Sequence, residues 1–194
     1  MDYSCMKIAS TARIARNATV IGDVELGEDC TVLFGAALRG DIGGRVIVGA
    51  RTNFQENACA HVPLGADTVI GSDVSVGHGA IVHGCTIGDG TLVGMGATVL
   101  DGAKVGARCL IGAGAVVTGK ADIPDEMMVI GSPAKAVRAL TPEEVASLAE
   151  NAREYVQIGR DLAAQGLIDE GFAANLGVQP APPAAVAAQN AGQE

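Results

Sequence analysis

Three histidines are the residues of this chain whose type and spacing suggest chemistry. They are His61, His78 and His83, and the chain contains no other histidine. Imidazole is the commonest metal ligand in proteins, and three imidazoles on a zinc ion leave its fourth position open for water or substrate. A lone surface histidine more often makes an ordinary hydrogen bond, so a metal site requires a fold that brings the three together.

The elements that must position these histidines repeat every six residues. Aliphatic residues recur at one position, which we call the core position, and the residue four places later is usually small. The core positions are Ile8, Ile14, Val20, Leu26, Val32, Leu38, Val48, Phe54, Ala60, Ile70, Val76, Val82, Ile87, Val93, Val99, Val105, Ile111, Val117 and Ile123. A period of six fits a short strand plus a tight corner, and three such units close a triangular coil. The pattern predicts an all-β fold, a parallel β-helix of hexapeptide repeats, and its length argues against a β-sandwich.

Two features modify the repeat. The period is interrupted at residues 43–46 and again at about 63–68, and we expect loops there. Glycine often follows the core position, as at Gly27, Gly49 and Gly71. Because glycine adopts corner conformations without steric cost, we expect these glycines to form the corners of the coil.

The phase of the repeat predicts that His61 and His83 lie one above the other. Each follows a core position, Ala60 or Val82. The distance between these positions is 82 − 60 = 22 residues, which is three units of six plus four loop residues. Neighbouring strands lie about 4.8 Å apart, so the two side chains should stack on the same edge. This spacing suits two ligands of one metal.

His78 has a different phase, because it follows the core position Val76 by two residues. Five extended residues, roughly 16 Å, separate it from His83, whereas zinc–nitrogen bonds are about 2.0–2.1 Å long. His78 can therefore complete the site only from a neighbouring molecule, and the phase predicts a cyclic homotrimer with a site at each interface. A rival hypothesis is a closed zinc site that uses Cys59 and Cys85.

The amino-acid composition argues against two classes of binding partner. The net charge is −9 and the isoelectric point is about 4.7, which argues against nucleic acids and anionic membrane surfaces as partners. No apolar run is long enough to span a membrane, and the start of the chain lacks a secretory pattern. We expect a cytoplasmic protein with reduced cysteines.

Beyond the repeat, the sequence predicts a C-terminal helix. Thr141 is a suitable N-cap, Pro142 suits the first helical position and Glu144 completes a capping box. We expect a β-helix domain at 1–124, a connecting segment at 125–140, a helix packed on the β-helix at 141–164 and a disordered tail at 171–194. The expected apolar stripe of the helix is Val145, Leu148, Ala149, Ala152, Tyr155, Val156, Ile158 and Leu162.

Several short runs carry a resemblance. They are Leu-Arg-Gly-Asp at 38–41, Thr-Asn-Phe-Gln-Glu-Asn at 52–57, Gly-His-Gly-Ala at 77–80, His-Gly-Cys at 83–85 and Gly-Met-Gly at 94–96, together with His61. From about Ile8 to Leu162, the chain resembles the γ-class carbonic anhydrases, including the proteins of carnitine and phenylacetate operons. The resemblance implies a left-handed β-helix, a homotrimer and a metal held by two histidines of one subunit and one of the next.

The same resemblance implies a reaction and a ligand set. His61, His78 and His83 would bind zinc, although three histidines also suit cobalt or ferrous iron. The activity would be the reversible hydration of CO2 to bicarbonate by a metal-bound hydroxide.

It also implies roles for five further residues. Asn53 and Gln55 would hydrogen-bond the metal-bound water or the substrate. Arg39 and Asp41 would pair at the subunit interface, or form an ordinary ion pair. Tyr155 would approach the site from the helix, or simply pack.

Two departures from the family pattern keep other functions open. Ile42 follows Asp41, and the loop at 62–67 has no glutamate to export the proton, which puts catalytic speed in doubt. One alternative is an acyltransferase that uses acyl-CoA, as many hexapeptide β-helices do, although these generally need a single histidine base. Another is a non-catalytic trimeric scaffold stabilised by metal.

Overall fold

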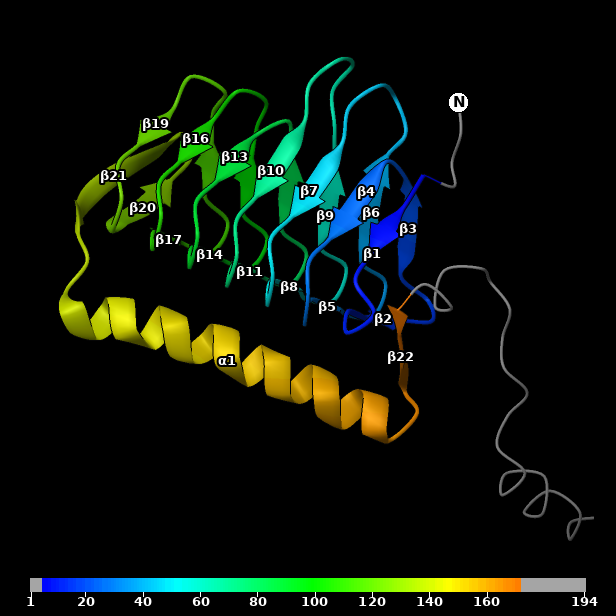
Figure 1. Cartoon of the computed structure of the whole chain (residues 1–194). Coiled ribbons are helices and arrows are strands. Elements are labelled where there is room, and N and C mark those ends of the chain that lie inside the picture. Colours follow the sequence, from blue (N-terminus) through cyan, green and yellow to red (C-terminus); the bar gives the residue numbers. More distant parts are fainter. Residues whose placement is uncertain (1–4, 172–194) are drawn as a thin grey trace, which may run out of the picture.

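The computed structural model describes residues 5–171 and forms a triangular prism of short strands with one long helix beside it (Figure 1). Each face of the prism is a sheet. Sheet I contains β1 (Lys7–Ile8), β4 (Val24–Leu26), β7 (Val46–Val48), β10 (Thr68–Ile70), β13 (Thr86–Ile87), β16 (Lys104–Val105) and β19 (Asp122–Ile123). Sheet III contains β3 (Thr19–Gly22), β6 (Ala37–Gly40), β9 (Cys59–His61), β12 (Ile81–His83), β15 (Thr98–Val99) and β18 (Val116–Val117).

Sheet II forms the remaining face and carries the antiparallel additions. Its parallel strands are β2 (Arg13–Ala15), β5 (Thr31–Val32), β8 (Asn53–Phe54), β11 (Ser75–Val76), β14 (Leu92–Val93), β17 (Leu110–Ile111) and β20 (Met127–Gly131). At its two ends, β21 (Ala134–Ala139) pairs antiparallel with β20, and β22 (Ile168–Glu170) pairs antiparallel with β2. The architecture confirms the predicted left-handed parallel β-helix with a C-terminal helix.

The core positions point into the prism and stack in register from coil to coil. Val20 pairs with Leu38, Leu38 with Ala60, and Ala60 with Val82. All four side chains are at least 98% buried, as is Phe54. A fully buried aliphatic side chain contributes about 1.5–3 kcal/mol, so this repeated stacking stabilises the fold and fixes its register.

The glycines after the core position have a different role from the one we expected. Gly27 does not have a positive φ; a Cβ built on it would lie 2.7 Å from the backbone nitrogen of Ala50 in the next coil. The left-handed corner conformation instead falls three residues after the core position, for example at Asp29 and Arg51, with φ of 55° and 58°. The prediction that these glycines form the corners is therefore wrong, because they permit close approach of successive coils.

The two interruptions of the repeat form loops between β6 and β7 and between β9 and β10 (Figure 1). Their backbones touch, since a Cβ on Gly44 would collide with the carbonyl oxygen of Ala66. The loops let the strands on either side of them keep their register despite the added residues.

The stretch at 125–140, where we expected a connecting segment, contains β20 and β21. Val129 follows Ile123 by six residues, is fully buried and pairs with Ile111, so the repeat continues for one more unit. The chain then turns at Ser132–Pro133 into β21, which pairs with β20. The expected domain division itself stays a prediction.

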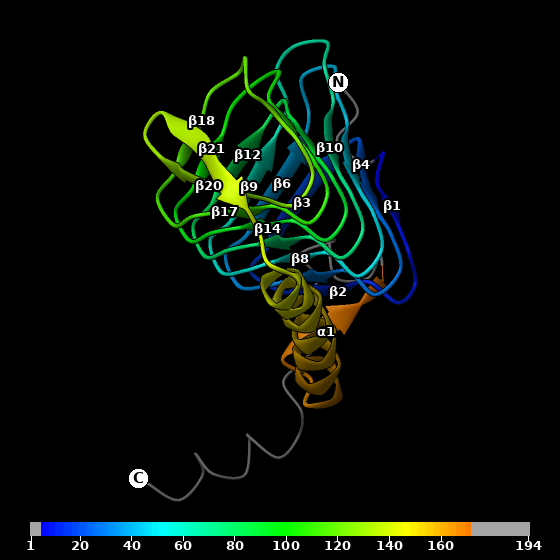
Figure 2. The ribbon, with the colours of Figure 1, turned by 90° about the vertical axis from the view of Figure 1, so that its left-hand side faces the viewer.

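Helix α1 (Pro142–Ala164) begins as the sequence predicted. The Thr141 side chain accepts from the Glu144 backbone N–H, and the Glu144 carboxylate accepts from the Thr141 backbone N–H. The helix lies beside sheet II (Figure 2) and buries Leu148, Ala152, Val156 and Gly159. Ala149 and Ile158 of the expected stripe are exposed, because the contact with the flat sheet is narrower than the stripe.

Apart from Gly171, the expected tail at 171–194 lies outside the described residues. Within residues 5–171, no helix is long and apolar enough to cross a membrane. The cytoplasmic location stays a prediction.

Candidate metal centre

His61 and His83 lie one above the other on the outer edge of sheet III. Strands β9 and β12 pair these two residues directly, and Nδ1 of His61 lies 3.0 Å from Nε2 of His83. The predicted stacking is confirmed. Two nitrogens bound to one tetrahedral ion at about 2.0–2.1 Å would stand about 3.3 Å apart. The facing nitrogens are therefore already at nearly the separation that a shared metal requires.

Carboxylates hold the other nitrogen of each of these imidazoles. Nε2 of His61 lies 3.0 Å from Oδ1 of Asp41, and Nδ1 of His83 contacts Asp101. Because an ionised carboxylate only accepts hydrogen bonds, each of these ring nitrogens carries the proton. Each of the two facing nitrogens then presents a lone pair, and the two lone pairs repel each other unless a cation or an additional proton lies between them. Carboxylates in this position are typical of metal-binding histidines.

Arg39 supports this arrangement through Asp41. Its guanidinium donates to Oδ2 of Asp41 at 2.6 Å and 3.1 Å, in the same chain. The hydrogen bond from Arg39 lowers the pKa of Asp41, and the contact with His61 lowers it further, against the opposing effect of burial. Although Asp41 is 93% buried, the Arg39 guanidinium therefore favours its ionised form beside His61. We call Arg39, Asp41, His61, His83 and Asp101 the paired half-site.

His78 lies elsewhere, at the corner between β11 and β12. Its Nδ1 is 2.7 Å from Oε2 of Glu56, and its side chain is 43% exposed. Its backbone N–H donates to Oε1 of Gln55 at 3.2 Å. Within the described part of one chain, no three histidine, cysteine, aspartate or glutamate residues are grouped so that they could hold a metal.

Asn53 and Gln55 accompany His78. The Asn53 amide donates to the Ser75 hydroxyl at 2.8 Å, and Gln55 Nε2 lies 3.4 Å from Oδ1 of Asn53. Both side chains are more than 90% buried. We call Asn53, Gln55, Glu56 and His78 the single half-site; within one chain it is separate from the paired half-site.

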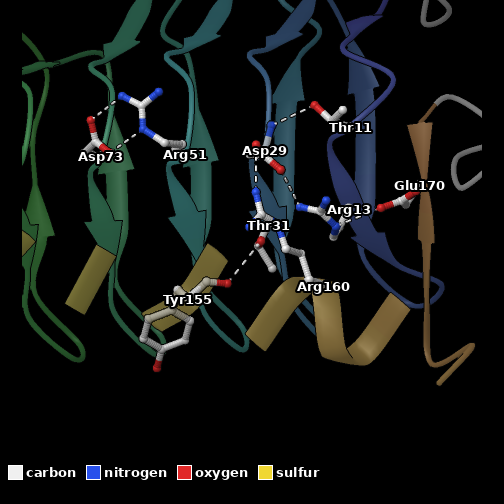
Figure 3. Close-up of polar contacts among 9 residues, drawn as sticks. All are labelled: Thr11, Arg13, Asp29, Thr31, Arg51, Asp73, Tyr155, Arg160 and Glu170. Atoms are coloured by element: carbon white, nitrogen blue, oxygen red, sulfur yellow. Dashed lines mark hydrogen bonds and ion pairs between the residues drawn. The ribbon is translucent and has the colours of Figure 1, made fainter. Parts of the chain in front are cut away.

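The single half-site opens into a cleft between sheet II and α1. The cleft has a volume of about 360 Å³, and its polar lining is Gln55, His78, Asn151 and Tyr155. Apolar side chains complete the lining: Leu92, Met95, Leu110, Ile111 and Ala113. Burial raises the pKa of the Tyr155 phenol, and the carboxylate of Glu56 raises it further. Tyr155 therefore lies beside the single half-site, while its backbone carbonyl accepts a hydrogen bond from Thr31 at 3.4 Å (Figure 3).

Within the described part of one chain, the residues of the rival cysteine site are not grouped so that they could hold a metal. Cys85 is 98% buried in the core, and burial raises the pKa of its thiol to about 12. Zinc binds the thiolate, so a thiol held protonated inside the prism is a poor ligand.

Several known proteins are similar to this chain in sequence. A family model for the bacterial transferase hexapeptide (six repeats) matches residues 67–101 and 84–119. A probable carbonic anhydrase from Methanocaldococcus jannaschii is 46% identical over 155 residues, which cover 80% of this chain and 97% of that protein. The mitochondrial gamma carbonic anhydrase 2 of Arabidopsis thaliana is 39% identical over 76% of this chain and 55% of its own length.

This chain belongs to the γ-class carbonic anhydrase-like family of hexapeptide-repeat proteins. Among solved structures, a putative acetyltransferase from Bacillus cereus is similar, with a TM-score of 0.80 and 37% identity over 82% of this chain and 92% of that one. Membership therefore establishes the fold and the family but leaves the reaction to be argued from the site.

The sequence analysis missed two residues of the site, Glu56 and Asp101. Glu56 could have been found from the register, because 78 − 56 = 22 is the same interval that separates His61 from His83. Asp101 follows His83 by 18 residues, one coil without a loop, but its contact depends on a side-chain conformation that the period does not set. The residues present fit a metal: two imidazoles have one nitrogen hydrogen-bonded to a carboxylate, and the third, His78, has a carboxylate oxygen of Glu56 at 2.7 Å.

Proposed function

We propose that this protein is a metal-dependent carbonic anhydrase whose active site is shared between two subunits of a homotrimer. The observation that supports it best is the pair of facing nitrogens of His61 and His83, 3.0 Å apart, each with its opposite nitrogen on a carboxylate. This arrangement would be satisfied by a cation between the two nitrogens, and two imidazoles alone bind one weakly. His78 of a neighbouring subunit would supply the missing ligand.

The residues of the chain divide the work as follows. His61, His78 and His83 would hold zinc, with cobalt or ferrous iron as alternatives. Bound zinc supplies hydroxide at neutral pH, because it lowers the pKa of its water to about 7. Asp41, Asp101 and Glu56 would fix the proton of each imidazole on the nitrogen away from the metal.

Asn53 and Gln55 would orient the reactants. Ser75 fixes the Asn53 amide, and Asn53 in turn contacts the Gln55 side chain, so Gln55 enters the cleft in one orientation. Pre-oriented hydrogen-bonding groups of this kind stabilise the developing charge on the oxygens during CO2 hydration without reorganising.

Proton export is the step for which this chain is least equipped. The loop at 62–67 contains Asp67 and no glutamate, and Asp67 is bound to Arg45 at 2.7 Å. The Arg45 guanidinium holds the pKa of Asp67 below its ordinary value, so Asp67 is a poor proton carrier at neutral pH. We therefore propose that turnover is slow unless a buffer removes the proton.

A direct test measures the metal content, the molar mass and CO2 hydration of the same preparation, purified without oxygen. We expect a trimer with about one metal per chain and a rate that rises with buffer concentration. His78→Ala and His83→Ala should both lose metal and activity. A monomer, or full activity in either variant, would overturn the proposal.

Acyl transfer is a second candidate, because the apolar cleft beside His78 is larger than CO2 needs and the similar Bacillus cereus structure is a putative acetyltransferase. The same two variants separate the candidates. A single histidine base at His78 predicts that His83→Ala retains acetyl-CoA turnover. The shared metal site predicts that neither His78→Ala nor His83→Ala is active.

A further inference from the structure

The cleft beside His78 contains an amide that the proposed mechanism does not use. Asn151 lies on the face of α1 that lines the cleft, where it joins Gln55, His78 and Tyr155 as the polar part of a largely apolar lining. Its Oδ1 atom is buried and has no hydrogen-bond partner among residues 5–171. A buried acceptor without a partner costs about 1–3 kcal/mol, so a ligand that brings a donor into the cleft would remove this cost.

No neighbour among the described residues donates to Oδ1 of Asn151. The Gln55 amide is already directed at Asn53, and its oxygen accepts from the His78 backbone. The remaining lining is apolar apart from His78 and the Tyr155 phenol.

The two carbon species of the proposed reaction differ in the property that Asn151 would detect. Bicarbonate presents a hydroxyl donor next to an acceptor oxygen, whereas CO2 has acceptors only. A carboxamide presents an acceptor next to a donor, and either orientation of the amide keeps both on one edge. The Asn151 amide can therefore make two hydrogen bonds to bicarbonate but only one to CO2.

We propose that Asn151 is a specificity residue that binds bicarbonate by a two-point hydrogen bond, accepting from its hydroxyl and donating to an adjacent oxygen. This inference rests on the proposed function. Asn151 would stabilise the bicarbonate complex and not the transition state. At buffer concentrations high enough that proton transfer does not limit turnover, its loss should raise the KM and the kcat of dehydration together and leave kcat/KM nearly unchanged in both directions.

The closing experiment compares bicarbonate with nitrate, a planar anion of the same shape that has no hydroxyl. Calorimetric titration of the zinc-loaded trimer gives both dissociation constants. Asn151→Leu, which has a similar volume and no hydrogen-bonding groups, should weaken bicarbonate about 10-fold and leave nitrate within about two-fold. Ser147→Leu, at an exposed position one turn earlier in α1, is the matched control and should change neither.

The outcomes separate this inference from the proposed function. Equal loss of both anions, or no loss of either, overturns the two-point bond. If Asn151→Leu does not fold, Asn151→Ala removes the same amide with the same expected selectivity. A wild-type trimer that neither hydrates CO2 nor binds bicarbonate contradicts the proposed function and this inference together, whereas an active wild type with an unselective variant contradicts this inference alone.

Discussion

The paired and single half-sites differ in what holds their side chains in place. In the paired half-site, coil stacking sets the two histidines in register, and the surroundings are charged: Arg39, Asp41 and Asp101. In the single half-site, His78 has one carboxylate neighbour and faces an apolar cleft whose far wall is a helix outside the repeat. Under the proposed function the two half-sites would have different roles: the repeat would hold the metal, and the helix would recognise the ligand that binds next to it.

Under the same proposal, one chain would be insufficient to form the metal site. A rigid coil presents its corners in three directions, so ligands on different corners of one prism do not converge. Assembly would bring the charged surface of one subunit against the apolar cleft of another.

The largest expected effect tests whether one metal site combines half-sites from two different subunits. His78→Ala and His83→Ala trimers should each lose their metal. When the two variants are unfolded and refolded together in equal amounts, about a quarter of the interfaces should pair an intact single half-site with an intact paired half-site. Metal analysis should then recover roughly a quarter of the wild-type content. Zero recovery would place all ligands within one subunit.

A smaller effect is expected from the carboxylates that hold the imidazoles. Asp101→Asn and Glu56→Gln should each weaken metal affinity by about 10–100-fold, as second-sphere substitutions typically do. A competition titration with a zinc chelator measures this. Asp122→Asn, an exposed aspartate on β19, is the control and should have no effect. Unchanged metal affinity in Glu56→Gln would contradict the proposal that His78 is a ligand of the metal.

Gly159→Ala should affect the single half-site alone. A Cβ at this position would collide with the Thr31 side chain, which also bonds the Tyr155 carbonyl, so the helix must shift. We expect a loss of about 1–3 kcal/mol in the free energy of unfolding and weaker bicarbonate binding, but unchanged stacking of His61 and His83.

Thr31→Ala should relieve that collision. The double variant is expected to recover most of the lost stability in chemical denaturation, because the two substitutions act on one contact. Additive losses in the double variant would show that the collision is not the cause.

The smallest effect concerns Glu144 at the start of α1. Its hydrogen bond from Arg138, with that from the Thr141 backbone, lowers its pKa from 4.5 to about 2. A lowered pKa in the folded state stabilises the protein above pH 4.5, and this contribution is lost as the pH falls toward 2. The melting temperature of Glu144→Gln should therefore lie slightly below wild type at pH 7 and converge with it near pH 2. A constant gap would contradict the assignment.

The repeat made the fold and the paired histidines predictable from the sequence. Every coil has the same backbone path, so a period of six fixes which residues point inward and which lie above one another. The interval of 22 residues predicted that His61 and His83 stack, as the structure shows. The six-residue period likewise predicted that His78 lies at a different corner. The helix start was equally local, since a capping box involves only neighbouring residues.

Other features depended on contacts between distant segments. The close approach of coils, and not the corner conformation, explains Gly27, and only the packed structure shows that distance. The cleft exists because α1 lies against sheet II, and the placement of Asn151 in it depends on the helix rotation that buries Leu148 and Ala152. The sequence by itself determined the register, because a repeated backbone converts sequence intervals into distances. Only the tertiary structure decided how the helix, outside that repeat, closes over the single half-site.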